Sequence, residues 1–343
     1  MSDDPILRRK GDHLDIVLAG EGRQDRKTTG LERLDFVHAA LPELHADAVD
    51  TSTTFLAKRL AAPLLVSAMT GGPERAEAVN RNIALACEAS GLAMAVGSQR
   101  VALESGAAAG IARDLRRHAP GIPLMGNLGA AQLALGYGAD EARRLVEMIG
   151  ADALTIHLNP LQEVLQHEGD RDWRGLLDRI AALADALDVP VGVKEVGNGI
   201  SAPLARRLAG HGIGLIDVAG AGGTSWAAVE GARHTDPAMR EVAAAFADWG
   251  IPTAHAVRDV RAACPSVTLI ASGGIRDGID AAKAIALGAD MVGQAAATLE
   301  AALEGPETLQ AHFAVVIEQL RVTMFCVGAR NLAALRKTEL VER

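Results

Sequence analysis

Short apolar runs alternate with longer amphipathic segments over most of the chain. We expect strands at 63–72, 92–97, 123–127, 153–158, 190–195, 214–219, 269–271 and 290–293. Helical periodicity separates the runs, as in Ala76–Ser90 after the first strand and Gly278–Leu287 after the seventh. Eight apolar strands that alternate with helices are typical of an α/β (β/α)₈ TIM barrel. An open doubly wound sheet is the main alternative, and the count of eight favours the barrel.

Glycines and small residues follow the last two predicted strands. Gly273 and Gly274 come after the seventh strand, and Ala295 and Ala296 come after the eighth. Adjacent glycines let a backbone approach a ligand closely, and the helix that begins at Gly278 directs its partial positive end towards them. Such turns form phosphate sites, which in (β/α)₈ barrels commonly follow strands 7 and 8. The alternative is an ordinary turn whose glycines only permit a tight bend.

The pattern divides the chain into three parts. Residues 1–60 are polar and irregular and form an N-terminal extension, residues 61–304 form the barrel, and residues 305–343 form a C-terminal helical segment. The extension begins with the basic cluster Arg8-Arg9-Lys10, for which a solvated tail is the default expectation. Within 31–60 we expect an ordered lead-in with an antiparallel pair at the lower end of the barrel. The C-terminal segment either closes the barrel or contacts another subunit.

Composition excludes several classes of protein. The 343 residues are 49% apolar and only 3% aromatic, with a net charge of −9. That balance argues against nucleic-acid binding, which needs basic surfaces or aromatic stacking platforms. The start of the chain lacks an apolar signal region, and no apolar run is long enough to span a bilayer. Three widely spaced cysteines without a zinc pattern indicate reduced thiols, so we expect a cytoplasmic protein without a membrane partner.

Polar residues fall at or just after the carboxyl ends of the predicted strands, where barrel enzymes place their catalytic groups. They are Thr70, Ser98, Arg100, Asn127, His157, Asn159, Lys194 and Thr224. Taken alone, His157 fits a core histidine and Asn127 fits a turn residue. Lys194 is harder to explain structurally, because a lysine in an apolar strand is rarely buried without a partner. Their shared position favours a functional site.

At this point the chain resembles a known family, the type 2, FMN-dependent isopentenyl-diphosphate isomerases. The matching motifs follow the family's order over almost the whole chain. They are Arg9-Lys10-x-x-His13, Ala68-Met-Thr-Gly-Gly72, Gly97-Ser-Gln-Arg100, His157-Leu-Asn-Pro-Leu-Gln-Glu163, Lys194-Glu-Val-Gly-x-Gly-Ile-Ser201, Gly220-x-Gly-Gly-Thr-Ser-Trp226 and Ser272-Gly-Gly-Ile-Arg276. The last is shared by many flavin barrels, whereas the Arg-Lys and His-Leu-Asn-Pro-Leu-Gln-Glu motifs are specific.

The resemblance implies a role for each matching residue. The implied FMN site comprises Ala68, Met69, Thr70, Ser98, Asn127, Lys194, Thr224, Gly273, Gly274, Arg276, Ala295 and Ala296. The implied diphosphate site comprises Arg9, Lys10, His13, Ser98, Gln99, Arg100, Asn159 and Gln162, with catalytic roles for Gln162, His157 and Lys194. Glu163 would bind Mg²⁺, although by itself it fits an exposed carboxylate in the first turn of a helix.

The implied reaction is a 1,3-allylic proton shift that interconverts isopentenyl and dimethylallyl diphosphate in isoprenoid biosynthesis. The resemblance implies reduced FMN as the active cofactor, NADPH as a reductant, and a tetramer or octamer. Our hypothesis is that flavin N5 carries the proton. Two alternatives remain open. An FMN-dependent 2-hydroxy-acid dehydrogenase would place a histidine base after strand 6, where this chain has Ala219-Gly-Ala-Gly-Gly-Thr224. A non-catalytic phospholigand-binding barrel would not require Glu163, Lys194 and Arg100 together.

Overall fold

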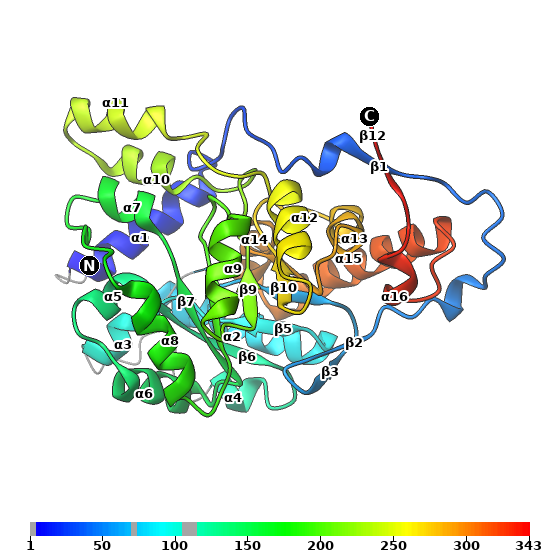
Figure 1. Ribbon diagram of the computed structural model, residues 1–343, viewed down its shortest axis with the longest axis horizontal. Coiled ribbons are helices and arrows are strands. Elements are labelled where there is room, and N and C mark those ends of the chain that lie inside the picture. Colours follow the sequence, from blue (N-terminus) through cyan, green and yellow to red (C-terminus); the bar gives the residue numbers. More distant parts are fainter. Residues whose placement is uncertain (1–4, 70–73, 105–114) are drawn as a thin grey trace.

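Eight parallel strands form a closed barrel in the computed structural model, which describes residues 5–69, 74–104 and 115–343 (Figure 1). The side chains of residues 5–8, 10, 74 and 75 are outside this description. The barrel strands are β4 (Leu64–Val66), β5 (Ala93–Ala95), β6 (Leu124–Gly129), β7 (Ala153–His157), β8 (Val191–Lys194), β9 (Leu215–Asp217), β10 (Thr268–Ala271) and β11 (Met291–Gln294). Each coincides with one of the eight predicted strands, and the open-sheet alternative is excluded because β11 pairs with β4.

Helices surround this barrel. They are α2 (Glu74–Ser90), α3 (Arg100–Glu104), α4 (Leu115–His118), α5 (Ala130–Ala134), α6 (Ala139–Ile149), α7 (Pro160–Leu165), α8 (Leu176–Ala186), α9 (Ala202–Gly210), α10 (Trp226–Arg233), α11 (Pro237–Ala245), α12 (Thr253–Ala263), α13 (Gly278–Ala286) and α14 (Ala296–Glu304). Helix α6 shows why they form: Ala142, Leu145 and Ile149 recur at helical spacing and are buried. Gly150 then ends the helix in the left-handed conformation. No helix in the described ranges has the length and apolarity needed to cross a membrane.

The inward-facing strand residues form an apolar plug at the lower end of the barrel. They include Leu65, Ala93, Met125, Ala153, Leu215, Ile270 and Met291. Phe55 and Leu60 belong to the same cluster. They come from a hairpin of β2 (Thr53–Phe55) and β3 (Lys58–Leu60), which is the antiparallel pair predicted within 31–60.

The C-terminal segment packs on the barrel. Helix α15 (Pro306–Cys326) contacts α2, α13 and α14 and buries Leu309, Phe313, Val316, Leu320 and Met324. After the short α16 (Leu332–Leu335), strand β12 (Leu340–Glu342) pairs with β1 (Leu34–Phe36) near the start of the chain. The segment therefore packs on the helices that flank the β11–β4 closure of the barrel. Two short 3₁₀ turns, Leu31–Arg33 and Ala46–Ala48, complete the lead-in.

The N-terminal segment differs from the irregular tail that its polarity predicts. Residues Pro5–Leu18 form helix α1, which contacts α10 and α14 (Figure 1). Leu14 is buried and Val17 packs against the same core. The apolar stripe is narrow and interrupted by charged residues, so the periodicity alone did not reveal the helix.

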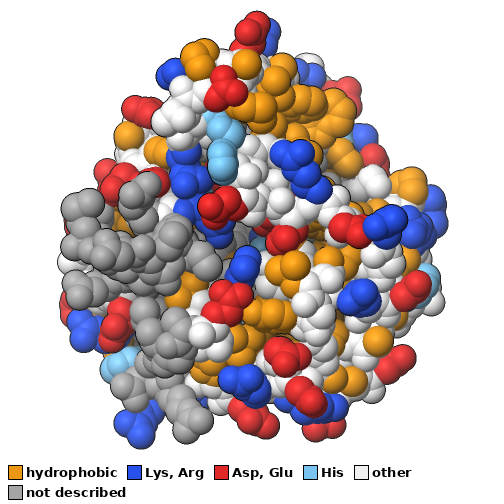
Figure 2. Space-filling model, turned by 90° about the vertical axis from the view of Figure 1, so that its left-hand side faces the viewer, with side chains coloured by type: hydrophobic (Ala, Val, Ile, Leu, Met, Phe, Trp, Pro, Cys, Tyr) orange, Lys and Arg blue, Asp and Glu red, His pale blue; other side chains and the backbone are white. Residues whose placement is uncertain are grey.

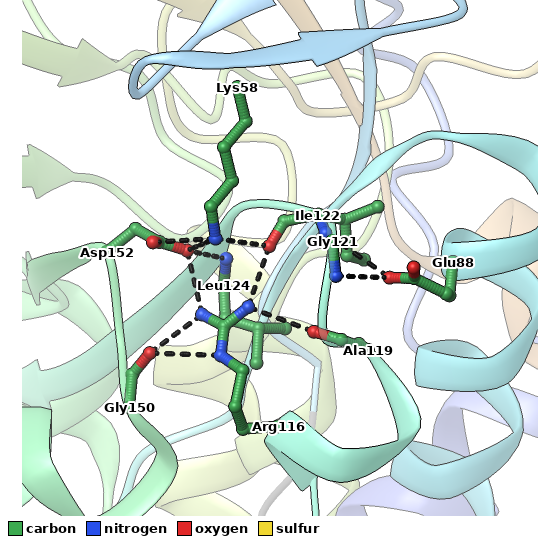
Figure 3. A network of polar contacts seen from close by, with 9 residues as sticks. All are labelled: Lys58, Glu88, Arg116, Ala119, Gly121, Ile122, Leu124, Gly150 and Asp152. Atoms are coloured by element: carbon green, nitrogen blue, oxygen red, sulfur yellow. Dashed lines mark hydrogen bonds and ion pairs between the residues drawn. The ribbon is translucent and has the colours of Figure 1, made fainter.

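Ionic contacts lock the lower rim of the barrel (Figure 3). Asp152, just before β7, accepts hydrogen bonds from Lys58 Nζ (2.8 Å), Arg116 Nη2 (2.8 Å) and the N–H group of Leu124 at the start of β6 (2.8 Å). Arg116 also caps the end of α6 through the carbonyl of Gly150. The network ties a hairpin, a helix end and two strands to one carboxylate.

The same arrangement recurs four strands further round the barrel. Asp290, just before β11, accepts from Arg261 Nη2 (2.6 Å) and from the N–H group of Leu269 in β10 (2.9 Å). Arg261 caps the end of α13 through the carbonyl of Gly288, as Arg116 caps α6. Arg336 supplies the second cation in place of Lys58. Two matching networks, one around Asp152 and one around Asp290, therefore connect neighbouring strands on opposite sides of the lower rim.

Candidate active site

The upper end of the barrel is polar, in contrast to the plug beneath it. Strand side chains alternate in direction, so the residues two positions after the plug residues also point inward. Two positions after a plug residue lie Ser67, Asn127, Asp217, Ser272 and Gly293, and four positions after one lie Gly97 and His157. Lys194 ends β8 in the same layer, as the register partner of His157 and Asp217. Above them lies a cavity of about 510 Å³, towards which residues from almost every strand–helix loop and from α1 converge. The site therefore occupies the catalytic end of a (β/α)₈ barrel.

The glycine turn after β10 lines this cavity. Gly273 and Gly274 have φ values of 98° and 71°, a region that favours glycine. A Cβ atom at Gly273 would collide with the backbone of Gly220, and one at Gly274 would lie 2.5 Å from the carbonyl oxygen of Gly222. Neither glycine N–H has a hydrogen-bond acceptor within the described chain. The turn thus presents two bare amide donors, which is the chemistry of an anion cradle.

The helix N-terminus that lines the cavity is that of α14, whereas that of α13, which was expected to face the glycines, does not line it. Asp277 caps α13 and accepts from the N–H groups of Ile279 and Asp280, and Gln319 Oε1 accepts from the N–H of Gly278. The donors at the N-terminus of α13 are consequently occupied, and two carboxylates stand there. By contrast, Ala295, Ala296 and Ala297 line the cavity at the start of α14 and carry no charge.

A strap formed by residues 22–29 covers the outer side of the cradle. Gln24 accepts a hydrogen bond from the N–H of Gly222 and donates its own N–H to Gly223 O (3.1 Å). Thr29 packs against Gly274 and Gly222. Arg23 pairs with Thr224 in an isolated β-bridge, and both residues line the cavity. Segments about 200 residues apart in sequence therefore build one wall together.

Buried charges lie beneath the cavity floor at β8 and β9. Lys194 and Asp217 are 7% and 4% exposed, and they are partners in the register of the two strands. Burial lowers the pKa of Lys194, while the negative charges of Asp217 and Glu195 act in the opposite direction. Glu195 accepts from the N–H groups of Val196, Gly197 and Asn198 and so shapes the loop after β8. Despite these bonds, burial raises the pKa of Glu195 to about 7.

The ends of β6 and β7 are joined by a side-chain hydrogen bond. His157 Nδ1 lies 2.8 Å from Asn127 Oδ1, and Asn127 Nδ2 donates to Val96 O (3.1 Å). Gln99 differs from the expectation for a ligand contact, because it is fully buried and does not line the cavity. Its amide accepts from the N–H of Asn127 (2.9 Å) and donates to Leu145 O (3.1 Å). Gln99 therefore supports Asn127 from below.

Three of the predicted residues lie at the start of helix α7: Asn159 is its N-cap residue, and Gln162 and Glu163 follow in its first turn. Asn159 Nδ2 donates to Gln162 Oε1 (3.1 Å) and Glu163 Oε1 (2.9 Å), and Glu163 Oε2 accepts from the N–H of Asp170 (2.9 Å). The carbonyl oxygen Oδ1 of Asn159 is buried without a partner in the described chain. All three side chains line the cavity. They form a polar ridge with one carboxylate, Glu163, that a cation could use.

Glu230 on α10 connects this ridge to α1, and the sequence analysis assigned no chemistry to its region. Gln162 Nε2 donates to Glu230 Oε1 (3.0 Å), and His13 Nε2 lies 2.9 Å from the same oxygen. Arg233 Nη1 donates to Glu230 Oε2 (2.7 Å). Burial raises the pKa of Glu230, but His13, Gln162 and Arg233 outweigh it and lower that pKa to about 2. Trp226, four residues earlier on α10, packs edge-on against the His13 ring.

The cationic residues that line the cavity differ in their hydrogen-bond and ion-pair partners. Arg100 donates to Glu104 (2.8 Å), and the largely exposed Arg276 lies 3.6 Å from Asp280. Arg9 has a buried Nε without a partner in the described chain, and Glu230 and Glu163 lie in its electrostatic surroundings. Burial lowers the pKa of Arg9. The Nε atom of Arg9 is therefore a buried donor beside the cavity that an anion could use.

Most of the predicted site residues converge on the cavity. Ala68, Met69, Ser98, Arg100, Asn127, His157, Asn159, Gln162, Glu163, Lys194, Thr224, Gly273, Gly274, Arg276, Ala295, Ala296, Arg9 and His13 all line it. Thr70 and the side chain of Lys10 are outside the described residues. Four further residues were not predicted: Arg23 and Gln132 line the cavity, and Asp217 and Glu230 contact residues that line it. Asp217 could have been found from its place at a strand end, whereas Arg23 and Glu230 reach the site only through long-range packing.

Comparison with known proteins places the chain among flavin barrels. Residues 141–342 match the FMN-dependent dehydrogenase family. The chain is 60% identical over 340 residues to an isopentenyl-diphosphate delta-isomerase of Xanthobacter autotrophicus, covering 99% of both chains. It is 58% identical to one of Stutzerimonas stutzeri and 50% identical to one of Synechococcus, covering at least 96% of each.

Solved structures agree on the fold. A mandelate oxidase variant with an FMN adduct aligns over 99% of both chains with a TM-score of 0.66 at 19% identity. Another mandelate oxidase variant, bound to (S)-mandelic acid, gives a TM-score of 0.67 at 19% identity. At this identity the likeness shows the shared barrel and carries no information on substrate.

Proposed function

The chain belongs to the isopentenyl-diphosphate delta-isomerase family, and on that basis we propose how its residues carry out a 1,3-allylic proton shift with reduced FMN and Mg²⁺. The reaction interconverts isopentenyl and dimethylallyl diphosphate, a step of isoprenoid biosynthesis. The observation that carries the proposal is that two chemically different groups of residues line opposite ends of one cavity. A neutral amide cradle lies at β10 and β11, and a ridge of amides with a carboxylate lies at β7 and α7.

The end of the cavity that carries the glycine turn fits FMN. Gly273, Gly274 and Ala296 would hold the phosphate on backbone N–H groups and the N-terminus of α14, where a side chain at either glycine would collide. Ala68, Met69, Asn127 and Thr224 would lie along the ring, and Lys194 near its N1–O2 edge. When bound and reduced, FMN supplies a proton donor and acceptor in a site with few free protein acids. A cation such as Lys194 favours the anionic reduced flavin.

The opposite end of the cavity, near β7, α7 and α1, fits a diphosphate. Arg9 and Arg100 supply positive charge there, Lys10 belongs to the same proposed set, and Ser98, His157 and Asn159 supply hydrogen-bonding groups. His13 would position α1 over the substrate through Glu230, because that carboxylate anchors it. A helix closed over the mouth would also exclude water from the alkene, which a carbocation-like species needs.

Glu163 is the proposed Mg²⁺ ligand. Mg²⁺ commonly binds one or two carboxylates together with substrate phosphate oxygens and waters. No cluster of three or more histidine, cysteine or acidic residues able to hold a metal exists within the described ranges. A site shared between Glu163 and the diphosphate suits such an arrangement. Asn159 would orient Glu163 through its 2.9 Å hydrogen bond.

Acid–base chemistry by the protein itself is limited in this mouth. Glu230 is the buried carboxylate nearest to Gln162, and its pKa of about 2 keeps it ionised at neutral pH. It is therefore an anchor for His13 and Gln162 and not a proton donor. Gln162 and His157 would orient the alkene and diphosphate, which gives them their proposed catalytic roles.

The experiment combines a flavin spectrum with two assays on the purified chain. We expect a yellow protein that converts isopentenyl diphosphate after anaerobic reduction and does not reduce its flavin with 2-hydroxy acids. The dehydrogenase alternative is disfavoured because Val218–Thr224, the loop after β9, contains no histidine. Flavin bleaching by a 2-hydroxy acid without isomerase activity would support that alternative. A protein without flavin would support the phospholigand-binding alternative.

Three further properties belong to the same proposal. The free thiols of Cys87, Cys264 and Cys326 suit a reducing cytoplasm. NADPH is the proposed physiological reductant, and a tetramer or octamer is the proposed assembly. Size-exclusion chromatography with light scattering and a reduction assay with NADPH test these points.

A further inference from the structure

Three neighbouring strands bring a lysine, an aspartate and a serine together at the floor of the cavity. Lys194 ends β8 and Asp217 ends β9, and the two residues are paired in the strand register. Ser272 directly follows β10, whose Ile270 is the register partner of Asp217. Ser272 Oγ donates to Asp217 Oδ1 at 2.6 Å, and the N–H of Ala219 donates to the same oxygen at 3.1 Å. Asp217 is therefore fixed from one side by β10 and its own loop.

Only two members of this group reach the cavity. Lys194 and Ser272 line it, whereas Asp217 lies beneath them and is 4% exposed. A ligand in the cavity can contact Lys194 but not Asp217. Any effect of Asp217 on a bound ligand must therefore pass through its neighbours.

Asp217 is the anion best placed to balance the buried Lys194. Within the described chain, the two carboxylates that act electrostatically on Lys194 are Asp217 and Glu195. The Glu195 carboxylate is already held by three consecutive backbone N–H groups, and the hydrogen bond from Lys194 Nζ goes to the carbonyl of Glu195. A buried ammonium without a counter-ion loses its proton, because burial penalises the charged form.

We infer that Asp217 is a positioning residue, which keeps Lys194 protonated and directed at the cavity and thereby sets the reduction potential of bound FMN. The inference rests on the proposed function, in which Lys194 lies beside the flavin ring. A charged Lys194 stabilises the anionic reduced flavin, whereas a neutral amine does not. Ser272 supports the effect by holding Asp217 in place.

The test measures the midpoint potential of FMN bound to the full-length protein by anaerobic dye equilibration. Asp217→Asn keeps the size of the side chain and removes its charge. We expect the affinity for reduced FMN, relative to oxidised FMN, to fall at least tenfold, equivalent to about 30 mV in a two-electron potential. A simple through-space charge effect has the opposite sign, because removing a nearby negative charge raises the potential.

Two further variants separate coupling from general damage. In a Lys194→Met background, Asp217→Asn should no longer lower the potential, because the residue through which Asp217 acts is gone. Ser272→Ala should shift the potential in the same direction by a smaller amount, and it provides the test if Asp217→Asn does not fold. The exposed Asp185→Asn serves as the matched control and should retain the parent value.

The outcomes distinguish this inference from the proposed function. An unchanged or raised potential in Asp217→Asn would overturn the inference, as would an equal shift in the Lys194→Met background. A parent protein that binds FMN but does not isomerise isopentenyl diphosphate would overturn the proposed function and leave this measurement valid. A parent that does not bind FMN would overturn both.

Discussion

His13 and Glu230, which lie 217 positions apart in the chain, meet at 2.9 Å and join α1 to α10 at the edge of the cavity. The same carboxylate binds Gln162 and Arg233, so one buried acid holds the N-terminal helix and a cavity side chain together. On the face drawn in Figure 2, a pale blue histidine lies next to basic side chains and near acidic ones above the centre of the view. This relationship makes the position of α1 depend on the charge of Glu230.

The first prediction concerns that carboxylate. Glu230→Gln should loosen α1, because His13 loses its anionic partner and Arg233 keeps only its longer, 3.4 Å contact to Asp12 of α1. The N-terminal segment should then be cleaved faster by protease at neutral pH. The KM for isopentenyl diphosphate should rise about tenfold or more. Glu241→Gln, an exposed change on the neighbouring α11, is the control. Equal protease sensitivity of the two variants would contradict the anchoring role.

The pKa of Glu230 gives this prediction a pH dependence. A carboxyl group whose pKa is lowered on folding stabilises the folded state above its unfolded pKa, and this contribution is lost as pH falls. For Glu230 the window runs from about 4.5 down to about 2. Docking of α1 should therefore weaken over this range in the parent protein and not in Glu230→Gln, which limited proteolysis with an acid protease would detect.

The second prediction concerns the phosphate cradle. Ala296→Asp should weaken FMN binding about 100-fold or more, because its carboxylate would stand against the phosphate at the start of α14. Substitutions at Gly274 are less informative, since its positive φ and close neighbours strain any side chain. Ala296→Asn is the neutral control of the same size. If equilibrium dialysis gives both variants the parent's affinity, the phosphate lies elsewhere.

The third prediction concerns the metal. Glu163→Gln should lose most isomerase activity and its Mg²⁺ dependence while retaining FMN, because a hard cation needs the carboxylate charge. The amide can still accept the hydrogen bond from Asp170, so the local structure should persist. Glu168→Gln, an exposed change five residues away, should behave like the parent. An active Glu163→Gln with an unchanged Mg²⁺ titration would place the metal at another residue.

The fourth prediction concerns the lower rim. Asp152→Asn should reduce the free energy of unfolding by about 2–4 kcal/mol, because Lys58 and Arg116 would lose their shared anion. Chemical denaturation measures the change, with the exposed Asp185→Asn as control. FMN affinity should not change, since the network lies at the end of the barrel opposite the cavity. A decrease in the free energy of unfolding below 0.5 kcal/mol would show that the Asp152 network is not important for stability.

The eight strands were predictable because both faces of a parallel barrel strand are buried, which produces short continuous apolar runs. Lys194 stood out for the same reason, as a charge inside such a run. The glycine turn was also predictable, but the helix beside it was misassigned. The positive end of the helix that begins at Gly278 was expected to face the glycines, whereas the side chain of Asp277 caps that end.

The remaining differences have physical causes that a linear pattern does not contain. Gln99 lies between the cavity residues Ser98 and Arg100, yet it points to the opposite side and is buried. Helix α1 and Glu230 belong to the site only because they pack together. Glu230 lies on α10, and the packing of α1 on α10 makes the position of Glu230 a buried one. Arg23 reaches the cavity by way of the strap over Gly222.

Solvent-exchange isomerisation tests the proposed function most directly. The FMN-loaded protein is reduced anaerobically, mixed with Mg²⁺ and isopentenyl diphosphate in D₂O, and followed by NMR and flavin absorbance. We predict many turnovers to dimethylallyl diphosphate, deuterium from solvent in the product, and a flavin that stays reduced. Absence of product, or product formed only in proportion to flavin oxidation, would contradict a proton shift without net redox change.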